Sequence, residues 1–232
     1  MKKVILFAFL LFFITSAQAQ KKKTKGKSDK EKKATTDYQQ SDPVADTATK
    51  FTGVIKYYMT TDDPSERDSM FIIFAEDKIK VTMFYPGYKP EDIFEDNYIA
   101  NFKDTTLLVL DNRKKTYKTE RLGARNEGTE MSLANYRKTG LVMKLTCKEY
   151  SGEMTMKDGD VFEAAALVSS HHSYINTVDY NFLNIQPVVL GYKIVLGYRT
   201  KTPDNENTYI IAYKIEPGDP AAYFDLAGYK AL

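Results

Sequence analysis

Residues 51–59 read Phe51-Thr52-Gly53-Val54-Ile55-Lys56-Tyr57-Tyr58-Met59. Side chains alternate between two faces of an extended chain, so four apolar side chains share one face: Phe51, Ile55, Tyr57 and Met59. The Asp62-Asp63-Pro64-Ser65 stretch that follows is typical of a turn. Together these residues predict a half-buried β-strand that ends in a tight reversal of the chain.

The same alternation continues along the chain in segments separated by Gly, Asp, Asn and Pro. It predicts antiparallel hairpins over residues 70–85, 105–121, 154–168 and 192–215. A further strand is expected over residues 141–148, with its odd positions, Cys147 among them, on the inner face. The 17 tyrosines and 13 phenylalanines also favour pleated sheet.

Two stretches break the alternation. Ser169–Ile185 places apolar residues at helix-like intervals before Pro187, and Thr129–Lys138 predicts a shorter helical piece. The expected fold class is therefore mainly β (α+β): a curved antiparallel half-barrel sheet, with one or two helices or loops covering its concave face. A sheet that curls without closing has a concave face that must be filled, covered or used for binding.

The first nineteen residues have the pattern of a secretory signal peptide. Lys2 and Lys3 precede an apolar run, Val4–Ile14, and Ala17-Gln18-Ala19 is a small-x-small cleavage site. We therefore expect an exported chain that begins at Gln20, periplasmic or secreted. The single cysteine, Cys147, is not at the cleavage point, so lipid attachment there is not expected.

Residues 20–49 are expected to form a disordered, lysine-rich linker, which leaves residues 50–232 as one domain. Lys21–Lys33 holds eight lysines against Asp29 and Glu31. The segment is interpreted as a solvated tether, or as a tether that associates with an anionic membrane surface or a wall polymer. Nucleic-acid binding is not expected, because basic residues are not interleaved with stacking aromatics.

No sequence motif indicates catalysis, a metal or a cofactor. His171 and His172 are adjacent, so their side chains diverge and do not form a chelating pair. Two acids of the cluster Glu91-Asp92 and Glu95-Asp96 could act as a glycosidase pair, but the cluster lies in an expected surface segment, where acidic residues are usually solvated. It also lacks the 12-residue spacing of a calcium loop. Cys147 is interpreted as a small buried hydrophobe. We expect a chain that is not an enzyme.

Three segments resemble the periplasmic lipoprotein-carrier (LolA-like) superfamily and its envelope relatives: Phe51–Tyr57, Asp77-Lys78-Ile79-Lys80 and Leu107–Tyr117. The likeness covers residues 51–215. It implies an unclosed β half-barrel with helices over its concave side, enclosing an apolar cavity that accepts acyl chains. The arginine that gates this cavity in true carriers maps onto no particular position of this sequence.

Two functional hypotheses follow. The first is a noncatalytic domain that binds a lipid, an acylated protein or another apolar ligand, since each buried methylene contributes about 0.8 kcal/mol. The expected lining is Phe51, Ile55, Tyr57, Ile79, Val81, Met83, Leu141, Met143 and Leu145, with Phe182 on the covering segment. The alternative is a structural or interaction protein of the cell envelope without a small-molecule ligand. In that case the same side chains fill a closed core.

Overall fold

The computed structural model describes residues 49–63, 67–85, 97–124, 127–174, 182–183, 186–187, 189–190 and 192–232. These residues belong to one compact unit, Val44–Leu232. The predicted signal peptide and residues 20–48 of the predicted linker lie outside the described residues. The domain boundaries expected from the sequence therefore stay predictions.

Strands dominate the described residues. They are β1 (Thr49–Lys50), β2 (Gly53–Thr61), β3 (Arg67–Phe74), β4 (Lys78–Phe84), β5 (Tyr98–Asn101), β6 (Thr106–Asp111), β7 (Thr116–Arg121), β8 (Glu130–Val142), β9 (Leu145–Thr155), β10 (Val161–Ser173), β11 (Phe182–Leu183), β12 (Gln186–Pro187), β13 (Val189–Leu190), β14 (Lys193–Lys201), β15 (Asn207–Pro217) and β16 (Lys230–Ala231). The described residues also include a short 3₁₀ helix, η3 (Ala221–Phe224).

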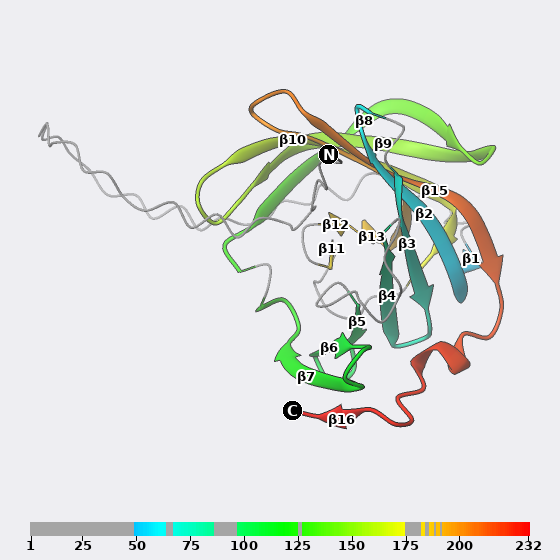
Figure 1. Ribbon diagram of the computed structural model, residues 1–232. Helices are drawn as coiled ribbons and strands as arrows, with labels where there is room; N and C mark the ends of the chain where they lie inside the picture. Colours follow the sequence, from blue (N-terminus) through cyan, green and yellow to red (C-terminus); the bar gives the residue numbers. More distant parts are fainter. Residues whose placement is uncertain are drawn as a thin grey trace, which may run out of the picture. The chain divides into compact units, whose positions relative to one another are not determined.

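Fourteen of these strands form one sheet in the order β16-β7-β6-β5-β4-β3-β2-β15-β14-β10-β9-β8, with β1 beside β10 and β13 beside β14. Neighbours are antiparallel except for β1 with β10 and β16 with β7. The sheet curls without closing, so β8 and β16 lie at opposite ends of it (Figure 1). The predicted fold class, mainly β with a curved, open antiparallel sheet, is confirmed.

One face of the sheet is apolar from strand to strand. The pairing aligns Ile55 with Ile72, Ile72 with Val81, Val81 with Tyr98 and Tyr98 with Val109. Side chains on this face, from β2 through β6 and from β9, β10, β14 and β15, join in a single buried cluster. Side chains from strands this far apart in the sheet meet on its concave side, and the core therefore lies there.

The opposite face carries a smaller apolar patch, which adjoins the C-terminal segment. Val54, Ile73, Ile99 and Leu110 are buried although they alternate with the concave residues. Near them, the Lys80 Nζ donates to the Tyr223 carbonyl oxygen at 2.7 Å, and the Lys78 ammonium lies over the Phe224 ring. The segment then ends as β16, paired with β7.

Both helices expected from the sequence are corrected where the structure describes them. Glu130–Val142 is a strand, because pairing along β9 outweighs a local helical spacing. Residues 169–173 belong to β10, and 182–183 form β11. The alternation fails near Ser169 because the register shifts between Val168 and Ser173. Residues 175–181 and 184–185 of the expected helix lie outside the described part.

One buried polar side chain stands out. Asn97 is 1% exposed, and neither its Oδ1 nor its Nδ2 has a hydrogen-bond partner within the described part of the chain. Its backbone carbonyl is used, because it accepts from the Leu110 N–H at 2.8 Å. A buried amide without partners costs stability that an apolar side chain of the same shape does not.

We therefore expect Asn97→Leu to raise the free energy of unfolding by about 1–2 kcal/mol, measured by urea denaturation followed by circular dichroism. Asn97→Asp is the matched control and should be destabilising, because it places a charge in the same surroundings. A less stable Asn97→Leu would show that the amide has a partner in solution.

Candidate functional site

The candidate site is the concave apolar face, where the sequence predicts a ligand cavity. Six of the expected lining residues are 0–6% exposed and belong to the core cluster: Phe51, Ile55, Tyr57, Ile79, Val81 and Met83. Leu145 is half-buried and packs against that cluster. The side chain of Phe182 lies outside the description. The structure thus brings together seven of the ten expected residues.

Leu141 and Met143 do not join them: they are 71% and 41% exposed, so their expected inward orientation is wrong. The expected strand over residues 141–148 is two strands, since Met143 and Lys144 have φ of 52° and 66° and form a two-residue turn between β8 and β9. The turn reverses the chain, which places Val142 opposite Leu145 and Leu141 opposite Thr146.

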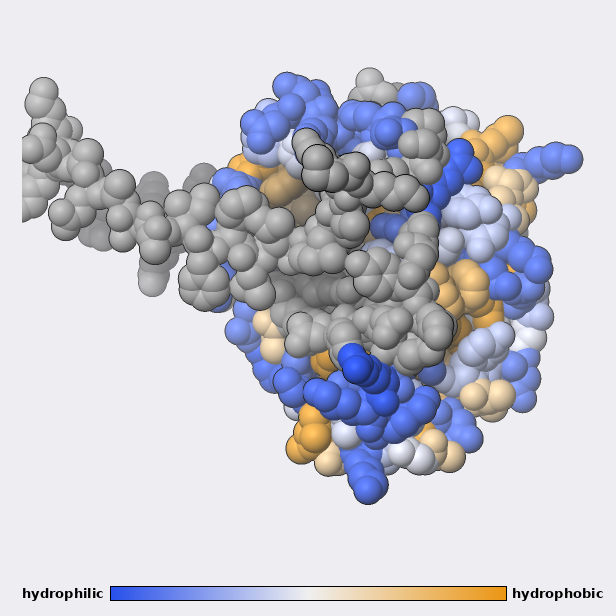
Figure 2. Space-filling model, viewed as in Figure 1, coloured by the Kyte–Doolittle hydropathy of each residue, from blue (hydrophilic) through white to orange (hydrophobic). Residues whose placement is uncertain are grey.

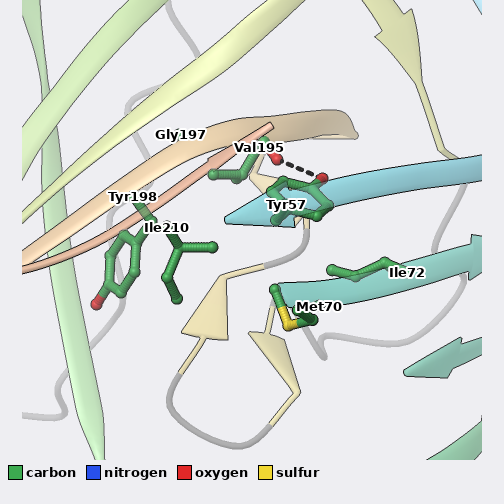
Figure 3. Close-up of a pocket in the computed structure, with 7 residues that line it drawn as sticks. All are labelled: Tyr57, Met70, Ile72, Val195, Gly197, Tyr198 and Ile210. Carbon is green, nitrogen blue, oxygen red and sulfur yellow. Dashed lines mark hydrogen bonds between the residues drawn. The ribbon is translucent and has the colours of Figure 1, made fainter. Parts of the chain in front are cut away.

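The Tyr57 hydroxyl crosses over β15 to donate to the Val195 carbonyl oxygen on β14 at 3.0 Å (Figure 3). This carbonyl lies next to an irregularity, because the pairing of β14 with β10 shifts between Val195 and Gly197. The β14 pairing with β15 ends at Gly197. Tyr57 therefore satisfies a buried carbonyl at the point where the sheet bends.

A small cavity lies at this bend. Its volume is about 10 Å³, and it is lined by Tyr57, Met70, Ile72, Val195, Gly197, Tyr198 and Ile210 (Figure 3). A space of this size holds about one water molecule, whereas a cavity of about 150 Å³ is needed to hold benzene. This cavity has no room for an acyl chain.

Burial also keeps the polar groups of this face neutral. The pKa values of Tyr57, Tyr198 and Tyr174 are raised, because removal from water disfavours the phenolate. Burial likewise raises the pKa of the Cys147 thiol, whose side chain is fully buried. A protonated, inaccessible thiol is a poor nucleophile.

Ser169 and His172 form the one close pair of nucleophile and base types that we find among the described side chains. Ser169 Oγ is 3.1 Å from His172 Nδ1, but it also accepts the backbone N–H groups of His171 and His172. Ser169 is fully buried. Its hydroxyl therefore stabilises the irregular end of β10, beside the point where β1 pairs with His172.

In the described part of the chain, no three His, Cys, Asp or Glu side chains come together as metal ligands. The acidic cluster at residues 91–96 lies outside that part. None of the described helices is long and apolar enough to cross a membrane.

The outer face of the sheet carries aromatic and cationic side chains that sequence reasoning did not single out. Tyr58 stacks on Tyr213 with ring centroids 3.9 Å apart, and the Arg67 guanidinium lies over Tyr58 at 5.6 Å. Ile211, opposite Tyr58 in the sheet, is 44% exposed. The sequence of β2 does indicate these outer side chains, since Lys56 and Tyr58 alternate with the buried residues of the strand and therefore point to the opposite face. Hydrophilic residues cover most of the described surface in Figure 2, with smaller hydrophobic areas between them.

Comparisons with known proteins provide no assignment. No protein-family model matches the chain, and no curated protein matches it. Among solved structures, the chain is similar to PNGF-II at 14% sequence identity and a TM-score of 0.47, over 78% of this chain and 30% of that one. The resemblance to the lipoprotein-carrier superfamily is not tested by these comparisons and stays a prediction.

The geometry of Tyr57 predicts a specific dependence of stability on pH. A buried tyrosine with a raised pKa keeps its proton in the folded state, whereas the unfolded chain ionises near pH 10. The folded state then binds more protons, so stability is complete below about pH 10 and falls as pH rises above it.

We expect Tyr57→Phe to cost about 1–2 kcal/mol at neutral pH, because the Val195 carbonyl loses its donor. The same substitution should make the alkaline decline shallower, measured by urea titrations from pH 7 to about pH 11. Tyr209→Phe is the control, since Tyr209 is less buried and bonds Asp62 at the surface. An unchanged alkaline slope in Tyr57→Phe would contradict the assignment.

Proposed function

We propose that this chain is a noncatalytic domain of the cell envelope that binds other macromolecules through its outer surface, while its own side chains fill its interior. The observation that carries the proposal is the burial of the concave face. Side chains that line an acyl-chain cavity remain accessible to a water-sized probe, but Ile55, Ile79 and Val81 are 0–1% exposed.

The polar groups in the core support a noncatalytic role. Tyr57 bonds the Val195 carbonyl, and the Tyr174 hydroxyl donates to the Lys78 carbonyl at 3.2 Å. Ser169 accepts two backbone N–H groups. Each of these side chains hydrogen-bonds backbone atoms of the sheet, so their hydrogen bonds serve the fold.

The N-terminal sequence supports an envelope location. The signal-peptide pattern of residues 1–19 predicts export, and Lys21–Lys33 supplies a cationic tether for anionic surfaces. The outer face supplies groups suited to contact with a macromolecule, because exposed Tyr and Arg side chains such as Tyr58 and Arg67 contribute strongly at protein interfaces.

A lipid carrier is the competing function, favoured by the continuous apolar lining of the curved sheet. Native mass spectrometry of the protein recovered after export separates the two functions. We expect the mass of the polypeptide alone, and no lipid in an organic extract. Stoichiometric lipid in both measurements would overturn a filled interior and restore the carrier hypothesis.

Enlarging a side chain on the concave face tests the packing directly. Ala166 is fully buried on β10, and Ala166→Leu should lower the free energy of unfolding by about 1–3 kcal/mol. Ala222→Leu, at an exposed position of η3, should change it by less than about 0.5 kcal/mol. An Ala166→Leu variant with an unchanged free energy of unfolding would indicate open space beside β10 and contradict the proposal.

A further inference from the structure

The hairpin of β8 and β9 extends past its neighbour in the sheet (Figure 1). The pairing of β9 with β10 ends where Cys147 lies opposite Ser169, whereas β8 and β9 continue to pair until Val142 lies opposite Leu145. Among the described strands, only β8 and β9 pair through residues 141–146. These six residues therefore form a projecting hairpin tip.

The hairpin tip exposes apolar side chains that the core does not use. Leu141 is 71% exposed and Met143 is 41% exposed. On the inner side of the same tip, Val142 belongs to the core cluster and Leu145 packs against it. The outward side chains of Leu141 and Met143 are thus free to contact another apolar phase, and their removal from water would be favourable.

The same part of the chain is cationic. Residues 131–148 contain four basic residues and no Asp or Glu. Lys144 lies in the turn and is exposed, and Lys148 lies opposite Thr139 just behind the tip. Glu149, the next residue, is 3.6 Å from Lys138. Apolar side chains at a tip with cations behind them match an anionic lipid bilayer, whose charged headgroups surround an apolar interior.

The predicted lysine-rich tether joins the domain at this end of the sheet. β1 begins directly after residues 20–48 and pairs with the last residues of β10, with Thr49 opposite His172. The β10 residue three positions earlier, Ser169, lies opposite Cys147 at the base of the hairpin tip. The point where the tether is attached and the hairpin tip therefore lie at one end of the sheet. Two weak membrane contacts that are linked in this way reinforce each other, because the first raises the effective concentration of the second.

An exposed aromatic side chain lies at the same end. Tyr192 is 63% exposed, and its carbonyl accepts the Tyr174 N–H just beyond β10. Tyrosine is enriched at the level of the headgroups in membrane proteins, because its ring is apolar and its hydroxyl is polar. The exposed side chains at this end thus suit a lipid surface better than a protein, since lysine is depleted at protein interfaces.

We propose that the hairpin tip is a membrane-contact site, at which Leu141 and Met143 enter the headgroup region of an anionic lipid bilayer while Lys144 and Lys148 contact lipid phosphates. The tether supplies long-range attraction, and the tip supplies the apolar contact. This inference rests on the proposed function only for the location in the cell envelope.

Cosedimentation of the full chain, recovered after export, with lipid vesicles tests the site. The vesicles contain phosphatidylglycerol and phosphatidylcholine in equal parts. We expect binding to weaken about tenfold when Leu141→Ser is combined with Met143→Asn, because the apolar contact is lost. Lys144→Glu should weaken it about fivefold or more at low salt, because one attraction becomes a repulsion. Asn suits the positive φ of residue 143.

Matched controls lie at the opposite end of the hairpin of β9 and β10. Val161→Ser changes an exposed apolar side chain, and Lys157→Glu reverses an exposed charge in the turn between β9 and β10. Neither should alter binding to the vesicles. Circular dichroism should show that the tip variants keep the fold, since the side chains of Leu141 and Lys144 are exposed.

A tryptophan reporter gives a second readout, which does not depend on affinity. The chain contains no tryptophan, so Leu141→Trp places a single indole at the hairpin tip. Its emission should shift to shorter wavelength when the anionic vesicles are added, and brominated lipids should quench it. Val161→Trp should show neither change.

Equal binding of the wild-type chain and the tip variants would overturn the proposal, because Lys21–Lys33 alone would then account for the contact. So would a wild-type chain that does not bind the vesicles, or an emission spectrum of Leu141→Trp that vesicles do not change. These results leave the proposed function standing, because they do not touch the filled interior. Stoichiometric lipid in the chain before vesicles are added would overturn the proposed function and leave the contact at the tip intact.

Discussion

The apolar concave face must be removed from water, and the rest of the structure follows from that constraint. Apolar side chains on β2 through β6 form one continuous row with those on β9, β10, β14 and β15. If the sheet were flat, this row could not cover itself and would stay exposed to water. Curling brings the ends of the row toward each other, so Tyr174 near the end of β10 reaches Phe74 and Phe102 with ring centroids 5.3 Å and 6.1 Å away. Curvature thus converts a two-dimensional apolar surface into a core.

Irregular pairing provides the curvature. The register shifts between Leu167 and Val168 in the β10–β14 pair, and between Ala212 and Lys214 in the β15–β2 pair, so extra residues bend the sheet at neighbouring places. Gly197 permits close packing at this bend, since a Cβ there would lie 3.0 Å from Leu167 Cδ1. The Tyr57 hydroxyl then satisfies the Val195 carbonyl. Tyr57, which the sequence predicts as part of a cavity lining, therefore stabilises the bend instead.

Period-two alternation was sufficient to predict the sheet and the buried row from Phe51 to Met83, because burial on one face leaves a regular signal. The alternation gave wrong predictions where the backbone conformation does not follow from the residue types. Met143 and Lys144 adopt positive φ without the Asn or Gly that usually marks such a turn, so Leu141 and Met143 were placed on the wrong face. Ser169 accepts the backbone N–H groups of His171 and His172, and this irregular end of β10 also has no signal in the alternation. Whether a face is hollow or filled depends on side-chain volumes across the sheet, which alternation does not encode.

An open sheet of this width has two edges, and each is a potential pairing site. The C-terminal segment covers one of these edges, because β16 pairs with β7. Its η3 helix covers the outer face near Lys80. The pKa of Lys80 is lowered there by burial and by the nearby Lys115 charge. At the other edge, the bulge between Asn135 and Thr139 and the charge of Lys138 restrict what can pair with β8, and strand addition by unrelated sequences is disfavoured as a result.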